Sequence, residues 1–313
     1  MREYSLIAPA KINLYLEIIG DRPDGFHELA MVLQSIDLAD KIDIKAIGIE
    51  TIVVRCDHPE VPADNANLAY RAAALLSKQF PDVFARYGGV EITIHKRIPV
   101  AAGLAGGSTN AAAVLVGLNM LWQLGLTRLQ LQELGAQLGS DIPFCIAGGT
   151  SLGTGRGEKL SPLQDLEDLY VILAKYRNLS VSTPWAYNTY RQQFGDSYVS
   201  DLDNLESRRQ RVHSGPIVSA IAHADNEKIG QLLHNDLEKV VLPEYPRVQK
   251  LREAFAAEKV LGTMMSGSGP TVFALTESRE QAKEIGSAVR SKMADTNLDF
   301  WTAKFNTTGI TLA

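Results

Sequence analysis

The 313-residue sequence has little cysteine, no surplus of positive charge and no long apolar run. Its two cysteines, Cys56 and Cys145, stand without metal-ligand spacing, which favours reduced thiols over a disulfide or a catalytic thiol. The net charge of −5 argues against a nucleic-acid partner. No apolar stretch approaches a membrane span, and residues 1–9 have neither the basic flank nor the length of a signal sequence. We therefore expect a cytoplasmic protein without a membrane partner.

The composition that is present is that of an ordinary globular protein. Apolar residues make up 45% and charged residues 21% of the chain. The length favours about two domains. The acidic balance does not exclude a nucleotide substrate, because a few local lysines and backbone amides suffice to hold one triphosphate.

Strand patterns dominate the start of the chain. Residues 11–18 alternate strictly, which predicts an apolar face and a polar face that carries Lys11, Asn13, Tyr15 and Glu17. After a turn at Asp24-Gly25, the N-terminal half predicts the strands 27–37, 41–47, 51–55 and 89–97 and the helices 67–80, 108–122 and about 127–138. Thr127 and Gln130 form a capping box for the last of these helices.

The second half interleaves strands and helices. We expect strands at 169–174, 272–275 and 300–305, and helices at 184–191, 215–224, 245–257 and 277–294. This order predicts an α+β protein of two domains, with the boundary between about residues 150 and 170. We place the domains at 1–160 and 161–313.

The strongest single signal is a glycine-rich stretch at residues 99–109, here called the glycine loop. Its small residues let the backbone approach a ligand closely, and Ser108 or Thr109 then starts a helix. The free amides and the positive dipole end of that helix form a ready anion site. A lone loop of this kind is about as often a plain strand-to-helix connection. The loop has no lysine after its last glycine, which excludes a Walker P-loop, and its spacing excludes a dinucleotide fingerprint.

A second glycine cluster, Ser266–Pro270 (S-G-S-G-P), is called the Ser-Gly segment. By itself it is more often a hairpin turn than a site. Its small residues would let it come close to the glycine loop.

The sequence resembles the GHMP kinases in three ordered motifs, P-A-K-I-N-L at 9–14, P-x-x-x-G-L-x-x-G-S at 99–108 and the Ser-Gly segment. R-P-D-G-F-H at 22–27 and L-G-S-D-I-P-F at 138–144 are similar to one member, which phosphorylates a methylerythritol carried on cytidine diphosphate in the non-mevalonate isoprenoid pathway. The resemblance implies an N-terminal domain like domain 2 of ribosomal protein S5 and a ferredoxin-like C-terminal domain. It implies ATP as co-substrate, with Mg²⁺ held mainly by the nucleotide, and leaves the oligomeric state unknown.

The resemblance also implies catalytic roles for Asp141 and Lys11. Asp141 would receive the proton of the acceptor hydroxyl, although a carboxylate after a helix stop is commonly just a helix N-cap. Lys11 would offset charge on the phosphate oxygens, whereas without the resemblance a lysine on a polar strand face is usually solvated.

Further residues follow from the same resemblance. The substrate side takes Asn13, Phe26, His27, Thr183, Tyr187, Gly267 and Ser268, with Phe26 and His27 on the cytosine; Trp185 is left as either core or site. The ATP side takes Asn67, Lys96, Pro99, Val100, Ala101, Ala102, Gly103, Leu104, Ala105, Gly106, Gly107, Ser108 and Thr109. The loop has alanine at 102 and 105, where glycine is frequent, and we expect it to tolerate both. A hydroxyl of Ser108 or Thr109 would lie near magnesium, and no acidic residue stands out as a certain metal ligand.

Two rival functions stay open on the sequence. One is another GHMP kinase that acts on mevalonate, homoserine or a sugar, which would have no cytidine site. The other is a non-catalytic nucleotide-binding module on the same fold.

Overall fold

The computed structural model of the chain describes residues 3–199, 208 and 214–313. Its strands are β1 (Glu3–Asp21), β2 (His27–Ala46), β3 (Ile52–Cys56), β4 (Val90–His95), β5 (Thr150–Gly155), β6 (Lys159–Pro162), β7 (Tyr170–Tyr176), β8 (His234–Asn235), β9 (Gly262–Met265), β10 (Val272–Thr276), β11 (Leu298–Asn306) and β12 (Thr311–Leu312). Its helices are α1 (Leu68–Gln79), α2 (Pro81–Tyr87), α3 (Gly106–Leu121), α4 (Arg128–Ala136), α5 (Ile142–Ala147), α6 (Thr183–Phe194), the 3₁₀ turn η1 (Gly195–Ser197), α8 (Pro216–Ala222), α9 (Asn226–Gln231), α10 (Glu238–Glu244), α11 (Pro246–Ala256) and α12 (Arg279–Met293).

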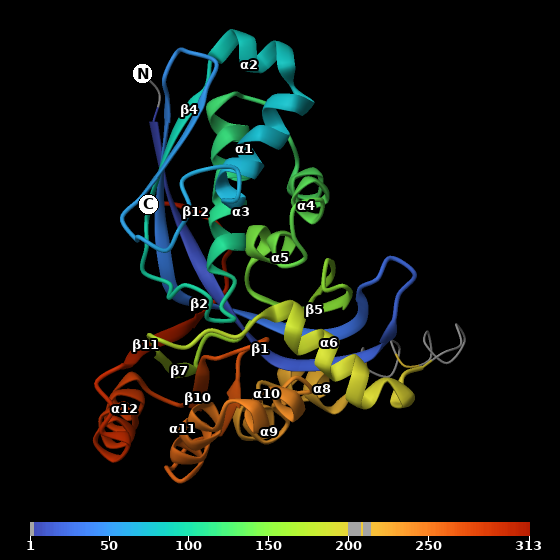
Figure 1. The fold of residues 1–313 in the computed structure, drawn as a ribbon, viewed down its shortest axis with the longest axis vertical. Helices are drawn as coiled ribbons and strands as arrows, with labels where there is room; N and C mark the ends of the chain where they lie inside the picture. Colours follow the sequence, from blue (N-terminus) through green and yellow to red (C-terminus); the bar gives the residue numbers. More distant parts are fainter. Residues whose placement is uncertain (1–2, 200–207, 209–213) are drawn as a thin grey trace.

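Two long antiparallel strands, β1 and β2, run through both halves of the molecule (Figure 1). The strands predicted at 27–37 and 41–47 are one continuous strand, β2, and β1 extends well beyond the predicted 11–18. In the upper half β2 also pairs with β4, and in the lower half with β5 and β11. The two strands therefore carry their side chains directly into the region where the halves meet.

The upper half is a sheet covered on one face by helices α1, α3, α4 and α5 (Figure 1). Alanines allow the close approach of α1 and α3, since Ala69, Ala72 and Ala73 of one helix and Ala111–Ala113 of the other are fully buried. The predicted capping box of Thr127 and Gln130 at the start of α4 is confirmed. Helix α3 begins two residues earlier than predicted, at Gly106.

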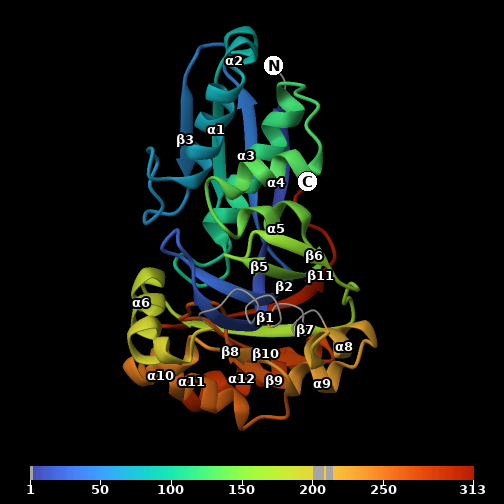
Figure 2. The same ribbon diagram turned by 90° about the vertical axis from the view of Figure 1, so that its right-hand side faces the viewer.

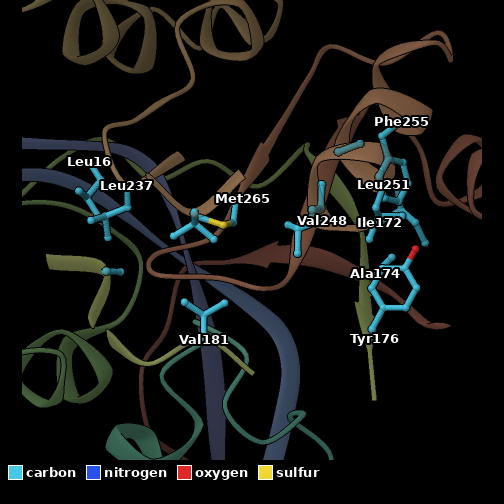
Figure 3. Close-up of a cluster of buried hydrophobic side chains, with 14 of the residues drawn as sticks. Leu16, Ile172, Ala174, Tyr176, Val181, Leu237, Val248, Leu251, Phe255 and Met265 are labelled. Carbon is cyan, nitrogen blue, oxygen red and sulfur yellow. The ribbon is translucent and has the colours of Figure 1, made fainter. Parts of the chain in front are cut away.

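The lower half is built on β9, β10, β7 and β11, with helices α9–α12 beneath the sheet (Figure 2). Its core packs Ile172, Ala174 and Tyr176 of β7 against Leu251 and Phe255 of α11 (Figure 3). The same core continues to Leu16 and Leu33 of the long strands.

The chain closes back on its beginning. Strand β12 pairs with β1, and Gly309 packs so tightly on the backbone of residues 145–147 that an added methyl would lie 2.4 Å from the Ile146 carbonyl oxygen. Strands β2 and β11 pair with each other although they come from opposite ends of the sequence. The domain boundary at 160/161 stays a prediction.

The predicted alternation of β1 is wrong in one respect that matters for the site. Register shifts interrupt the β1–β2 pairing between Asn13 and Tyr15 and again further along. An irregular step of this kind reverses the face on which the following side chains emerge. Lys11, Asn13 and Leu16 therefore line one cavity, whereas Tyr15 and Glu17 line a different one.

Candidate functional site

One cavity of about 720 Å³ lies where the two halves meet, here called the central cavity. Every site residue predicted above lines it except Thr109, which is fully buried. The cavity collects side chains from β1, β2, the glycine loop, the segment before α5, the start of α6 and the Ser-Gly segment. The tertiary structure thus brings together positions that are up to 257 residues apart, from Lys11 to Ser268.

The glycine loop forms the floor of the cavity on the side expected for ATP. Its N-cap residue for α3 is Ala105, with φ 58° and ψ 28° and no side-chain capping bond. No serine side chain caps the start of this helix. The first-turn amides, which have no partner inside a helix, are free for a ligand at the positive end of the dipole.

Ala105 also qualifies the expectation that the loop tolerates its alanines. The left-handed conformation costs an L-residue with a Cβ about 1–2 kcal/mol, a cost that glycine avoids. Ala102 carries no such strain, because its φ is not positive. Alanine in place of glycine is thus tolerated at position 105 at the cost of local backbone strain, whereas alanine at position 102 causes no such strain.

The Ser-Gly segment lies directly against the glycine loop, as its small residues predict. The Ser266 hydroxyl donates to the Gly103 carbonyl at 3.1 Å. A methyl group added at Gly103 would lie 2.2 Å from the Ser266 carbonyl oxygen, and the φ of Gly103 is +73°. Only glycine fits at Gly103, on both counts.

Lys11 and Asp141 meet at the centre of the cavity. The Lys11 Nζ lies 3.8 Å from the Asp141 Oδ2 and donates to the Asn13 Oδ1 at 2.8 Å. Lys11 is only 5% exposed, so it is not a solvated lysine on an open strand face, as the strand pattern alone would suggest. The pair comes from strand β1 and from the residue that precedes α5, which are 130 positions apart in the chain.

Asp141 occupies the N-cap position of α5 but makes no side-chain capping bond there. The sequence predicted no helix after Asp141, and the short apolar helix α5 was missed. Because the carboxylate is not used to cap this helix, it stays available to the cavity, where its side chain is 31% exposed.

The cytosine side predicted for Phe26 and His27 is the opposite end of the cavity. Phe26 is 51% exposed, an unusual state for a phenylalanine, and the guanidinium of Arg156 lies over its ring, 4.8 Å from the centroid. The imidazole of His27 packs on Tyr187 with the ring centroids 5.1 Å apart. Its buried Nε2 has no hydrogen-bond partner among the described residues. Burial, followed by the charge of Arg191, lowers the pKa of His27, so the ring is neutral at pH 7.

The start of α6 closes the same end of the cavity. Ser182 caps the helix, and the Thr183 hydroxyl lies 2.7 Å from the Ser268 hydroxyl, which joins α6 to the Ser-Gly segment. Tyr187 follows one turn later, and burial raises the pKa of its phenol. Trp185 points elsewhere, with its ring against Tyr245 at 5.6 Å, so the choice left open for it is decided in favour of the core.

Asn67 and Lys96 line the expected ATP side, but their side-chain groups already have partners. Asn67 caps α1 through its Oδ1 and donates to the Pro62 carbonyl at 2.7 Å. The Lys96 Nζ bonds to Asp40 at 2.5 Å. We infer that both residues shape this part of the cavity and do not themselves hydrogen-bond to the adenine of ATP.

Sequence reasoning missed Asp40, Asn110 and Arg156. Asp40 is fully buried, and its carboxylate accepts from Lys96, from the Asn110 side chain at 2.8 Å and from the backbone N–H of Arg97 and Ile98. It thereby fixes the entry to the glycine loop. Asp40 lies in an alternating strand, where an acidic residue is normally solvated, so no local pattern distinguishes it.

Two further observations concern metal binding and membrane-spanning helices. Among the described residues, no group of three or more histidine, cysteine or acidic side chains is arranged to bind a metal ion. None of the helices in the described part of the chain is both long and apolar enough to cross a membrane.

Comparison with known proteins identifies the family. The chain matches the family model described as GHMP kinases N terminal domain over residues 67–149 and the one described as GHMP kinases C terminal over residues 217–295. It is 72% identical to a 4-diphosphocytidyl-2-C-methyl-D-erythritol kinase of Trichodesmium erythraeum, with 100% of both chains covered. It is 65% identical to the kinase of the same name from Nostoc punctiforme, over 99% of this chain and 98% of that one.

A solved structure agrees with these relatives. The crystal structure of a 4-(cytidine 5′-diphospho)-2C-methyl-D-erythritol kinase shares 30% identity and a TM-score of 0.73 with this chain, and the match covers 97% of this chain and 99% of that one. The predicted two-domain GHMP kinase fold is confirmed. The chain is a small-molecule kinase that belongs to the GHMP kinases and, within them, to the family of 4-diphosphocytidyl-2-C-methyl-D-erythritol kinases.

Proposed function

We propose that the chain transfers the γ-phosphoryl group of ATP to the 2-hydroxyl of 4-(cytidine 5′-diphospho)-2-C-methyl-D-erythritol, which gives the 2-phosphate and ADP in the non-mevalonate isoprenoid precursor pathway. The observation that carries the proposal is the Lys11–Asp141 pair, 3.8 Å apart, in the cavity that also contains the glycine loop and Phe26. The glycine loop expected to bind phosphates, a charged pair and an aromatic ring all line one cavity.

Asp141 acts as the base for the acceptor hydroxyl. An alcohol does not ionise at neutral pH, but in a loose phosphoryl-transfer transition state its proton need leave only late, so a nearby carboxylate suffices. Lys11, held by Asn13, places a positive charge where the transferred group passes between donor and acceptor. The first-turn amides of α3 and the backbone of the glycine loop bind the phosphates of ATP.

The opposite end of the cavity recognises cytidine. The exposed ring of Phe26 offers an aromatic face to a base. Burial favours the neutral form of His27, and its Nε2, which has no hydrogen-bond partner among the described residues and lies 3.8 Å from the Asp21 Oδ1, is suited to a hydrogen bond with a polar edge of the cytosine. Thr183 and Tyr187 close this end from α6.

Mg²⁺ would bind as a complex with the triphosphate of ATP. Ser108 lines the cavity and would place a hydroxyl near this ion, and the described side chains include no cluster that could hold the ion by itself. Thr109, considered as the alternative hydroxyl, is buried outside the lining. When bound, the ion neutralises charge that develops on the phosphate oxygens.

The proposal is tested by measuring ADP release with a panel of acceptors. The cytidine-linked methylerythritol, mevalonate, homoserine and galactose are compared at equal concentration, with free cytidine added as a competitor. We expect turnover with the first acceptor alone and competitive inhibition by cytidine. Turnover with another acceptor that cytidine does not inhibit would assign the chain to a different kinase activity, and ATP binding without turnover on any acceptor would favour the non-catalytic module.

A further inference from the structure

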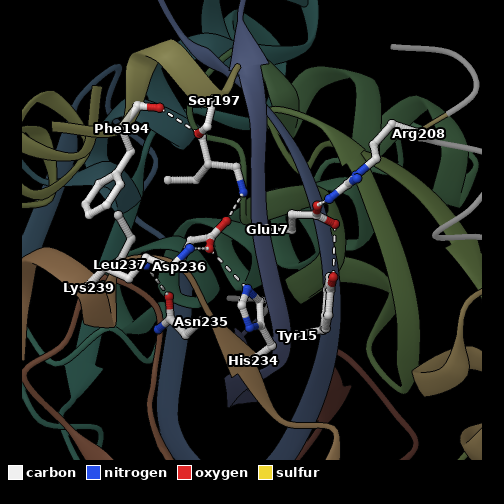
Figure 4. Close-up of polar contacts among 11 residues, drawn as sticks. Tyr15, Glu17, Phe194, Ser197, Arg208, His234, Asn235, Asp236, Leu237 and Lys239 are labelled. Carbon is white, nitrogen blue, oxygen red and sulfur yellow. Dashed lines mark hydrogen bonds and ion pairs between the residues drawn. The ribbon is translucent and has the colours of Figure 1, made fainter. Parts of the chain in front are cut away.

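The buried side chain of Asn235 in β8 forms hydrogen bonds with the backbone at the start of the Ser-Gly segment. Asn235 is 4% exposed, and its Nδ2 donates to the carbonyl oxygens of both Met265 and Gly267 at 2.8 Å. Its Oδ1 accepts from the Leu237 N–H at 3.0 Å (Figure 4). Both amide hydrogens of this side chain are therefore used by backbone carbonyls, one in the segment and one in the last residue of β9 that precedes it.

The bond to the Gly267 carbonyl sets the direction of a neighbouring donor. The carbonyl of Gly267 and the N–H of Ser268 belong to one planar trans peptide unit and point in opposite directions. Drawing this carbonyl toward Asn235 turns the Ser268 N–H away from Asn235. No described residue accepts a hydrogen bond from that N–H, and Ser268 lines the central cavity.

Gly267 lies close both to the charged pair and to the glycine loop. A methyl group added at Gly267 would lie 3.6 Å from the Lys11 Nζ, 3.4 Å from the Asn13 Oδ1 and 3.2 Å from the Gly103 carbonyl oxygen. Lys11 stands beside Asp141, where the acceptor hydroxyl is expected, and Gly103 belongs to the loop expected to hold the phosphates. The Gly267–Ser268 peptide is therefore within reach of a phosphoryl group that moves from the glycine loop toward the Lys11–Asp141 pair.

We propose that Asn235 is a positioning residue that aims the Ser268 N–H at the phosphoryl group in transfer. The inference rests on the proposed function, because it needs a phosphoryl group at this place. The amide at 235 suits this place, since its NH₂ group donates to two carbonyls while its oxygen accepts from the Leu237 N–H, a combination that the donor-only side chains of lysine and arginine cannot provide. A backbone N–H oriented in advance toward developing negative charge stabilises the transition state without reorganisation.

The neighbours of Asn235 keep its own position fixed. Asp236 accepts from the Ile18 N–H of β1 at 2.8 Å, and Glu238 accepts from the Met265 N–H at 2.8 Å and from the Arg252 Nε at 2.9 Å. Glu238 thus binds the same strand end as Asn235 but does not contact the Gly267 carbonyl. It supplies a matched control for the stability of this region.

The test compares Asn235→Asp and Asn235→Ala with Glu238→Gln in steady-state kinetics. In Asn235→Asp an oxygen replaces Nδ2 in a side chain of the same shape, and it repels the two carbonyls, so the Gly267–Ser268 peptide turns. We expect kcat to fall about 10- to 100-fold, below the 10²- to 10³-fold typical for a deleted oxyanion donor, because the N–H is misdirected and not removed. The KM values for ATP and for the cytidine substrate should stay within about threefold, since the effect is confined to the transition state.

Asn235→Ala removes the two bonds without adding repulsion, so it keeps the test open if the aspartate variant does not fold. It should show the same split between kcat and KM with a smaller fall in kcat. Glu238→Gln should keep kcat within about twofold of wild type even where its thermal midpoint drops.

Several results would overturn the inference. Wild-type kcat in both Asn235 variants would remove the positioning role, and so would a raised KM with unchanged kcat, which indicates simple binding. An equal loss of kcat in Glu238→Gln would show that the loss reflects general loosening of the strand end. A wild-type chain without turnover on the cytidine substrate would overturn the proposed function and this inference together, whereas the other outcomes affect the inference alone.

Discussion

Replacement of Asp141 by asparagine tests the centre of the proposed mechanism. The carboxylate lies 3.8 Å from the Lys11 Nζ and is 31% exposed. At this distance, and with an effective dielectric constant of about 20, the two charges attract by about 4 kcal/mol, a figure that the partial exposure of Asp141 reduces. Lys11 keeps the Asn13 Oδ1 as an acceptor in the variant, so the fold should persist.

The expected kinetic loss follows from the role of the carboxylate. General-base catalysis contributes about 10²- to 10⁴-fold, which corresponds to about 3–5 kcal/mol of transition-state stabilisation. Asparagine has nearly the same shape but cannot take the proton of the acceptor hydroxyl. We therefore expect kcat to fall about 10²- to 10⁴-fold while the Kd of ATP changes by less than about threefold, because ATP binds mainly to the glycine loop.

The assay couples ADP release to NADH oxidation, with ATP binding measured by calorimetry on the same preparations. Asp299→Asn serves as the control, since this partly exposed carboxylate on β11 forms an ion pair with Arg177 and does not line the central cavity. The control should keep the kcat of the wild type. Turnover of Asp141→Asn within about tenfold of wild type would refute the assignment of Asp141 as the base, and a parallel loss of ATP affinity would show that the residue serves binding.

Three other predictions follow from the structure of the cavity and its surroundings. Phe26→Ala should raise the KM for the cytidine substrate about 5- to 100-fold and leave the KM for ATP unchanged, because stacking of a base on an aromatic ring contributes about 1–3 kcal/mol. An equal rise in both KM values would show that the cytosine binds elsewhere. The pKa of His27 is lowered in the folded state, so at acidic pH the folded protein binds fewer protons than the unfolded chain. The contribution of His27 to stability should therefore be complete above about pH 6.5 and decrease below it, and the KM for the cytidine substrate should rise as the ring protonates. A His27→Gln variant with the same pH profile as the wild type would contradict this. Asp40→Asn should lower the free energy of unfolding by about 3–5 kcal/mol in urea titrations, because it leaves the buried ammonium of Lys96 without its carboxylate, and a change below about 1 kcal/mol would show that the pair is dispensable.

Much of the local structure was readable from the sequence because it depends on short-range rules. The capping box at Thr127, the helix rich in alanine and leucine after the glycine loop, and the break at that loop all follow from residues that are neighbours in the chain. Short helices such as α5 were not predicted, since a helix of six apolar residues is stabilised by what packs on it and not by its own pattern.

The motifs also predicted most of the residues that line the central cavity, but not the partners that those residues have there. Lys11 reads as a lysine on a polar strand face, and only the folded structure shows that this face is closed over and that Asp141 lies beside it. The irregular step after Asn13 is invisible to an alternation rule, yet it decides which side chains of β1 reach the central cavity.

Asp40 and Asn235 show the same limit most clearly. Each is a polar residue of ordinary appearance in the sequence, and each acquires its part through partners that are distant in the chain, Lys96 and Asn110 for the first and Gly267 for the second. The sequence by itself determined the family, most of the longer helices and strands and the two glycine-rich stretches, because these depend on local composition and spacing. Which carbonyls, amides and charges face one another was decided by tertiary packing, since buried polar groups must find partners and the chain supplies them from distant segments.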